Sequence, residues 1–158
     1  MLHERWDRNT AKKTTEKTGK KTAGRTTEQA KTDKLEKVFI SEADQYLFSQ
    51  ATHYDIYKKL GAHVSEERRK RGVYFGVWAP NASAVHVIGS FNGWDESAHP
   101  MEKLGPVGIW GLFIPGVKTG EMYKFLITAK DGRKIYKADP FANSAEYRPG
   151  TASVITDL

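Results

Sequence analysis

The chain has 158 residues, of which 39% are hydrophobic, so it is long enough for one domain with a core but too short for a large two-domain enzyme. It has no cysteine, which excludes disulfides and thiolate zinc sites and fits a reducing cytoplasm. Most of the formal net charge of +6 lies in residues 1–37, with eleven Lys and Arg against six Asp and Glu, so the rest of the chain lacks the basic excess of a nucleic-acid-binding domain.

Residues 1–36 form the first predicted segment, a disordered basic tail. They are rich in Lys, Thr, Glu and Gly, with Trp6 as their only aromatic residue, so they offer too little apolar area to offset the entropy of ordering. A solvated leader is the favoured interpretation, and an electrostatic arm for acidic partners is the alternative. Since no apolar run is long enough for a signal sequence or a membrane span, we expect a cytoplasmic protein with no membrane partner.

Residues 37–69 form the second predicted segment, a connector of short helices. Apolar side chains recur here every three or four residues: Phe39, Ala43, Tyr46, Leu47, Ile56, Tyr57 and Leu60. Ser41 is the predicted N-cap of the first helix, with Asp44 three residues on, and Gly61 is the predicted end of the second. Helices this short are not stable alone, so they need a surface to pack on.

Residues 70–158 form the third predicted segment, an all-β domain. Apolar residues alternate with other residues in short runs: Val73, Phe75 and Val77; Val85 and Val87; Trp110, Leu112 and Ile114; Tyr123, Phe125 and Ile127; then Ile135, and Val154 with Ile155. The intervening segments are rich in Gly, Pro, Asn and Asp, and Asp131-Gly132 is the clearest hairpin turn. About six strands in so short a stretch predict a β-sandwich with hairpin connections.

The sequence shows no pattern of catalytic or metal-binding residues. Asp95 and Glu96 are neighbours in a loop and Asp139 precedes a proline at a turn, whereas glycoside hydrolysis needs two acids that face each other across the sugar bond. We therefore expect these three to be solvated loop acids. The five histidines form no ligand set, and no nucleotide-binding or nucleophile motif occurs, so we predict no catalytic residue, no metal and no cofactor.

Aromatic residues carry more information. Trp78 and Trp110 lie in strand patterns, which favours core or inter-domain packing over ligand contact. Trp94 instead ends a turn-rich loop, where a large ring has no evident folding role, so contact with a sugar face and packing under its own loop are equally favoured. On the strand of Tyr123, the pleat turns Lys124 to the outer face, where a lysine taken alone is usually solvated.

Several segments in register resemble the N-terminal region of bacterial 1,4-alpha-glucan branching enzymes. They are LGAH at Leu60–His63, GVYFGVWAPNASAVHVIGSFNGWD at Gly72–Asp95, HPM at His99–Met101, GIW at Gly108–Trp110, YKF at Tyr123–Phe125, KADPFA at Lys137–Ala142 and RPGTASVI at Arg148–Ile155. The resemblance implies an immunoglobulin-like β-sandwich, a non-catalytic family 48 carbohydrate-binding module. In a parent enzyme it would bind α-1,4/α-1,6 glucan chains such as glycogen and pack on a glycoside hydrolase family 13 barrel, whose catalytic machinery is not in this chain.

The resemblance also implies site residues. Related modules in the beta subunit of AMP-activated protein kinase bind glycogen on one face, and matching their motif implies carbohydrate-binding roles for Trp94, Lys124, Tyr136 and Thr151. Two positions depart from that motif: Tyr136 replaces a tryptophan on a longer hairpin, and Ser153 replaces a ligand-contacting asparagine. The alternative function is a structural domain that docks the barrel without sugar binding, and a nucleic-acid-binding tail ranks last.

Overall fold

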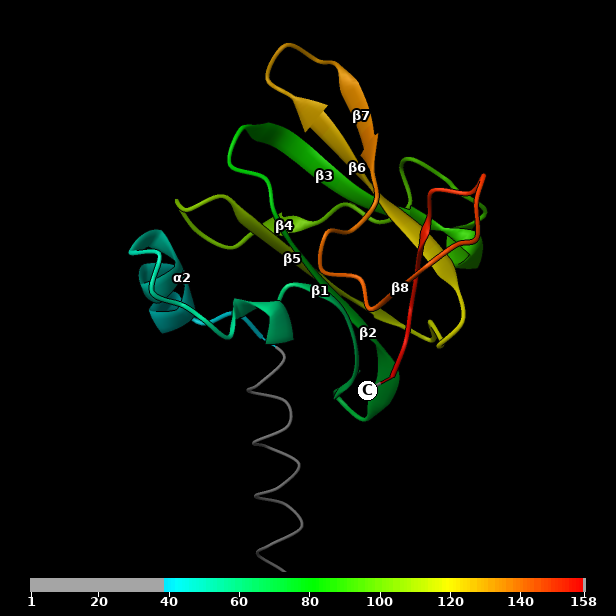
Figure 1. Cartoon of the computed structure of the whole chain (residues 1–158), viewed down its shortest axis with the longest axis horizontal. Coiled ribbons are helices and arrows are strands. Elements are labelled where there is room, and N and C mark those ends of the chain that lie inside the picture. Colours follow the sequence, from blue (N-terminus) through cyan, green and yellow to red (C-terminus); the bar gives the residue numbers. More distant parts are fainter. Residues whose placement is uncertain (1–38, 158) are drawn as a thin grey trace, which may run out of the picture.

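The computed structural model describes residues 39–157, which fold into two antiparallel sheets packed face to face (Figure 1). One sheet has the strand order β1-β2-β5-β4, and the other has the order β3-β6-β9-β8 with β7 paired to β6. Short helical segments precede the sheets. The prediction of an all-β sandwich after short helices is therefore confirmed, while the predicted tail at residues 1–36 lies outside the described residues.

The elements follow one another with these bounds: α2 (Glu42–Ser49), the 3-10 helix η1 (Ile56–Lys58), β1 (Gly61–Glu67), β2 (Lys70–Trp78), β3 (Ala82–Gly89), the 3-10 helix η2 (Ser90–Asn92), β4 (Glu102–Lys103), β5 (Ile109–Pro115), β6 (Met122–Ala129), β7 (Lys134–Lys137), β8 (Ser144–Ala145) and β9 (Ser153–Val154). Figure 1 shows the β6–β7 hairpin extending beyond the rest of the sandwich. The turn of that hairpin contains Gly132 with φ +85°, as the Asp131-Gly132 pair predicts.

The alternating apolar residues fill the space between the sheets. One cluster joins the inward residues of β2, β3, β5 and β6, among them Phe75, Val87 and Phe125, all fully buried. Each such side chain contributes about 1.5–3 kcal/mol to stability through burial. Trp110 belongs to this cluster and its indole donates a hydrogen bond of 3.1 Å to the Ala79 carbonyl, which confirms its predicted place in the core.

The predicted helical connector is wrong for residues 61–67, which form β1. This strand pairs with β2 along its whole length, so the sandwich begins nine residues before the predicted boundary at residue 70. Arg68 and Arg69 have φ of 49° and 64° and close a tight hairpin of the type that needs left-handed residues. Glu66 lies opposite Arg71, and such opposite charges support the register of a polar strand.

The first helix forms where predicted, but its packed face differs. Ser41 and Asp44 make the predicted capping box. Tyr46 and Leu47, expected to pack, are 65% and 43% exposed, whereas Asp44 and Gln45 are buried. The cause is polar: the Gln45 side-chain amide donates a hydrogen bond of 2.8 Å to the Leu104 carbonyl, which turns this side of the helix toward the sandwich.

The helical segments cover the outer face of the β1-β2-β5-β4 sheet. Ile40, Leu60 and Ile109 form a second buried cluster there. Phe48 of α2 contacts Trp78 edge-on, with ring centroids 5.5 Å apart. Figure 1 shows α2 at the side of this sheet, away from β7. Within residues 39–157, no helix is both long and apolar enough to cross a membrane.

Asp44 ties the helical segments together and makes their attachment dependent on pH. Burial opposes its ionisation most, but hydrogen bonds from Lys59 (2.5 Å), His53 (2.8 Å) and Ser41 outweigh it and hold the pKa of the carboxyl well below its usual range. The Asp44 carboxyl therefore binds a proton more weakly in the folded state than in the unfolded state. The resulting stability is present above about pH 4 and is lost as pH falls through the lowered pKa.

We expect this carboxylate to contribute on the order of 2 kcal/mol at neutral pH. Thermal unfolding followed by circular dichroism should show a steeper fall in Tm between about pH 5 and about pH 2 for the wild type than for Asp44→Asn, which has no carboxyl to titrate. Parallel pH profiles for the two proteins would contradict this role of Asp44.

Candidate functional site

The loop that follows β3 presents Trp94 in a strained backbone conformation. At Gly89 the loop starts against β6, where an added Cβ would lie 2.3 Å from the Met122 carbonyl oxygen, so only glycine fits. Gly93 and Trp94 both adopt left-handed backbone angles, with φ of 64° and 62°. Glycine adopts them freely, but a bulky residue does so at a cost of about 1–3 kcal/mol, which is typical of residues held in place for a function.

The side chain of Asn92 fixes the base of this loop. Its carbonyl oxygen accepts from the Gly89 N–H (2.9 Å), and its amide donates to the Val87 carbonyl (3.1 Å) and to His99 Nδ1 (2.9 Å). The N–H of Trp94 in turn donates to the Gly89 carbonyl at 2.9 Å. This network holds the strained tryptophan at the end of β3.

Lys124 faces outward on β6, as the pleat predicts. It lies opposite Ile88 of β3, and two residues further on Leu126 lies opposite Tyr136 of β7. Ile88 and Leu126 are only 3% and 1% exposed, so neighbouring side chains cover these two, whereas Lys124 is half-buried and Tyr136 is exposed. Lys124 and Tyr136 are diagonal neighbours on it, about 7–8 Å apart by sheet geometry.

Thr151 joins this face through a direct contact. The ammonium group of Lys124 donates a hydrogen bond of 2.7 Å to the Thr151 hydroxyl. Thr151 just precedes β9, whose Ser153 lies opposite Tyr123 of β6. The structure thus brings Lys124 and Thr151 together, with Tyr136 beside them on the neighbouring strand.

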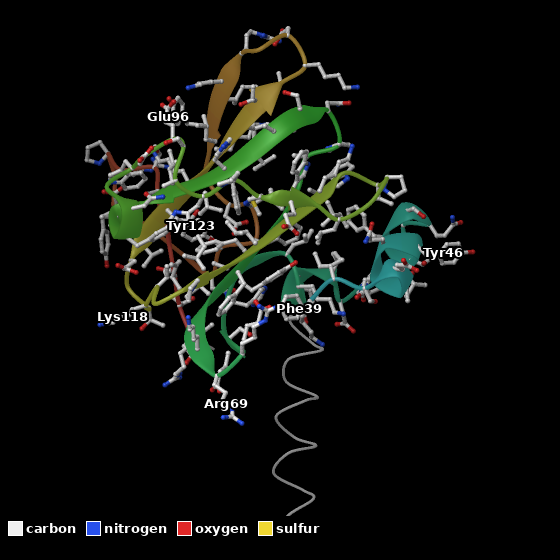
Figure 2. All side chains as sticks on the ribbon, turned by 180° about the vertical axis from the view of Figure 1, so that it is seen from behind. Phe39, Tyr46, Arg69, Glu96, Lys118 and Tyr123 are labelled. Carbon is white, nitrogen blue, oxygen red and sulfur yellow. The ribbon has the colours of Figure 1, made fainter. Side chains whose placement is uncertain are left out.

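Glu96 links the Trp94 loop to the same face, and the expectation that it is merely solvated is wrong. Its carboxylate accepts hydrogen bonds from the Lys134 ammonium and the Tyr136 hydroxyl of β7, and these two groups, Lys134 first, lower the pKa of the Glu96 carboxyl. Figure 2 shows Glu96 beside that strand. No local pattern could have revealed this contact, because it joins residues 38 and 40 positions apart.

Asp139 is also not a solvated loop acid. It is 7% exposed, accepts a hydrogen bond of 2.5 Å from the Tyr123 hydroxyl, and donates its N–H to the Ser153 hydroxyl at 2.8 Å. Burial, more than any other influence, raises the pKa of this carboxyl. Asp139 therefore anchors the end of the chain near Thr151. Among residues 39–157, no three or more His, Asp and Glu side chains gather as a metal site would require.

A family profile described as "Carbohydrate-binding module 48 (Isoamylase N-terminal domain)" matches residues 59–142, more than half of the chain. The chain belongs to this family. The match to module 48 starts just before β1, in agreement with a sandwich that begins at Gly61.

Several bacterial proteins resemble this module 48 chain over most of its length. The 1,4-alpha-glucan branching enzyme GlgB of Butyrivibrio fibrisolvens is 68% identical over 123 residues, which cover 78% of this chain and 19% of the relative. The GlgB of Marinobacter nauticus is 48% identical over 123 residues, 78% of this chain and 20% of the relative. The chain thus spans about a fifth of the length of these curated relatives.

Solved structures support the sandwich fold of module 48. A Klebsiella pneumoniae pullulanase complexed with maltotriose matches 63% of this chain and 10% of its own, with a TM-score of 0.51 and 25% identity. The pullulanase of Bacillus acidopullulyticus matches 63% of this chain and 12% of its own, with a TM-score of 0.50 and 26% identity. In both, a sandwich of this shape is one part of a much longer chain.

Proposed function

We propose that this chain is the α-glucan-binding module of a 1,4-alpha-glucan branching enzyme, and that it guides glycogen-like chains toward a catalytic barrel on which it packs. Membership of the module 48 family and 68% identity to a GlgB support this assignment. The observation that carries it is on the outer face of the second sheet, where Lys124 contacts Thr151 and lies diagonally from Tyr136. We propose that Trp94, whose loop reaches Tyr136 through Glu96, completes a binding platform with these three residues.

The chemistry of this platform suits an α-glucan chain. Trp94 and Tyr136 are 39% and 53% exposed, so each offers part of an aromatic ring to the C–H groups of a sugar. Lys124 and Thr151 supply a hydrogen-bond donor and a hydroxyl between them for the sugar hydroxyl groups. A neutral polysaccharide has no charged groups, so a protein recognises it by stacking on its sugar rings and by hydrogen bonds to its hydroxyl groups.

We assign the module a binding role without catalysis. Two acids near the platform are engaged in contacts that hold the structure: Glu96 with Lys134 and Tyr136, and Asp139 with Tyr123. The branching reaction would then belong to the rest of a longer parent enzyme.

Native affinity electrophoresis tests the binding claim. The chain should migrate more slowly through a gel that contains glycogen than through a plain gel, whereas a gel with hydroxyethylcellulose, a β-1,4-linked glucan, should leave its mobility unchanged. Unaltered migration in the glycogen gel would contradict the proposal.

A structural role is the second candidate, and a different surface favours it. Tyr46, Tyr54, Tyr57 and Trp78 are 51–87% exposed on the side of α2 and η1, and Trp78 also borders an apolar cleft of about 390 Å³. Exposed apolar groups of this kind mark docking surfaces. Self-association of the chain in sedimentation velocity, together with no retention by glycogen, would favour a spacer that only docks the barrel.

A further inference from the structure

Glu96 connects the Trp94 loop to β7, the strand that carries Tyr136. One carboxylate oxygen accepts from the Tyr136 hydroxyl and the other accepts from the Lys134 ammonium group. Lys134 and Tyr136 are two residues apart on β7, so they point to the same face of the strand. A single side chain therefore fastens the loop after β3 to β7 at two points, across the outer face of β6.

The link between Glu96 and Trp94 is short and braced. Asp95 accepts hydrogen bonds from the Ser97 N–H (2.8 Å) and the Ser97 hydroxyl (2.7 Å), which fixes the turn between them. Trp94 is only two residues from Glu96, a reach of at most about 7 Å even in an extended chain. Release of Glu96 from β7 would therefore loosen the position of Trp94.

Tyr136 depends on the same carboxylate. Its ring is 53% exposed, and its hydroxyl donates to Glu96. An exposed ring without this bond samples several rotamers, and fixing it on binding weakens the affinity about two- to tenfold. A ring that is already fixed binds without that cost.

We propose that Glu96, with Lys134 as its counter-ion, is a positioning residue that holds the Trp94 loop and the Tyr136 ring as one preformed platform for an α-glucan chain. The inference rests on the proposed function and names the residues that preorganise its site. The inference predicts a salt dependence of binding that direct contact between Glu96 and sugar would not produce. Glucan is uncharged, so its affinity should fall with salt only because salt weakens the exposed Glu96–Lys134 ion pair.

Titration calorimetry with maltoheptaose tests the inference on the full chain and four variants. Glu96→Ala removes both contacts, and Glu96→Gln keeps an acceptor for Tyr136 but removes the charge. Tyr136→Phe keeps the ring and loses only the hydroxyl. Asp131→Asn is the matched control, because Asp131 forms an exposed ion pair of 2.6 Å with Arg133 at the tip of the same hairpin, away from the platform.

We expect binding about tenfold weaker in Glu96→Ala and in Tyr136→Phe, about threefold weaker in Glu96→Gln, and unchanged in Asp131→Asn. Between about 0.05 M and about 1 M NaCl the wild type should lose affinity while Glu96→Gln should not. Tm should stay within a few degrees of the wild type in all four, since these groups lie at the surface.

The outcomes separate the inference from the proposed function. A wild type that binds maltoheptaose together with a Glu96→Ala variant that binds equally well overturns the positioning role alone. Equal salt dependence in the wild type and Glu96→Gln also overturns it. A wild type that binds neither maltoheptaose nor glycogen overturns the proposed function and the inference together.

Discussion

Replacement of Trp94 by glycine is expected to abolish retention by glycogen without lowering the stability of the fold. Trp94 holds a φ of 62°, which glycine adopts freely, so the change should relieve about 1–3 kcal/mol of backbone strain. The indole is 39% exposed, so its removal gives up only part of a packed surface. Thermal unfolding should therefore give a Tm equal to or above that of the wild type, while the sugar-facing ring is lost.

Two further variants make this result specific. Trp94→Ala removes the ring but keeps the strained backbone, so it should bind at least about tenfold more weakly without the gain in stability. Trp78→Ala is the matched control, because Trp78 is another exposed tryptophan (51%) but lies on β2 of the other sheet, where it packs against Phe48 of α2. Should Trp94→Gly be retained by glycogen as strongly as Trp78→Ala, the assignment of Trp94 to the binding face is wrong.

The largest loss of stability is expected from Asp139→Ala. The carboxylate accepts hydrogen bonds from the Tyr123 hydroxyl (2.5 Å) and the Phe141 N–H (2.8 Å), and Tyr123 is fully buried. Removal of the acceptor leaves a buried hydroxyl unpaired, which costs about 1–3 kcal/mol, and a backbone N–H beside it. We expect a loss of about 3 kcal/mol in urea unfolding, with weaker glycogen retention, because the same contacts anchor the segment that carries Thr151.

A double-mutant cycle with Tyr123→Phe checks the cause. Since the two groups share one hydrogen bond, the combined variant should lose less stability than the sum of the single changes. Strict additivity would show that the loss comes from packing instead.

Asp139→Asn should also change the pH dependence of stability. Burial raises the pKa of the Asp139 carboxyl, so the folded state binds this proton more tightly than the unfolded state does. Its contribution is present below about pH 4 and is lost as pH rises through the raised pKa. The asparagine variant should lack that decline, and an unchanged profile would argue against the raised pKa.

The strands were predictable from the apolar residues at every second position. Val73, Phe75 and Val77 on β2 and Tyr123, Phe125 and Ile127 on β6 lie in or against the core between the sheets, as predicted. The sequence did not predict β1 because the outer half of this strand is polar. Glu66 and Glu67 are held in the strand by pairing with Arg71 and Lys70 across the hairpin, and not by hydrophobic burial. Pairing between strands leaves no periodic signal in one strand alone.

The helix shows the opposite error. Its capping box is local, so Ser41 and Asp44 predicted it correctly. Its orientation is not local: hydrogen bonds from Gln45 to the Leu104 carbonyl and from Lys59 to the Asp44 carboxylate turn the helix so that Tyr46 points away. Hydrophobic spacing misjudged the buried face because long-range polar contacts decide it.

By itself, the sequence determined the class of the fold and the sheet faces, because alternation and turn residues are written in neighbouring positions. Its resemblance to glycogen-binding modules supplied the four residues proposed to contact sugar. Only the tertiary structure decided how that site is held together. It seats Trp94 in a left-handed conformation, places the Lys124 ammonium against Thr151, and fastens the tryptophan loop to Tyr136 through Glu96. These contacts join segments that are distant in the chain, and such contacts exist only once the two sheets have packed and brought the loops over the same face.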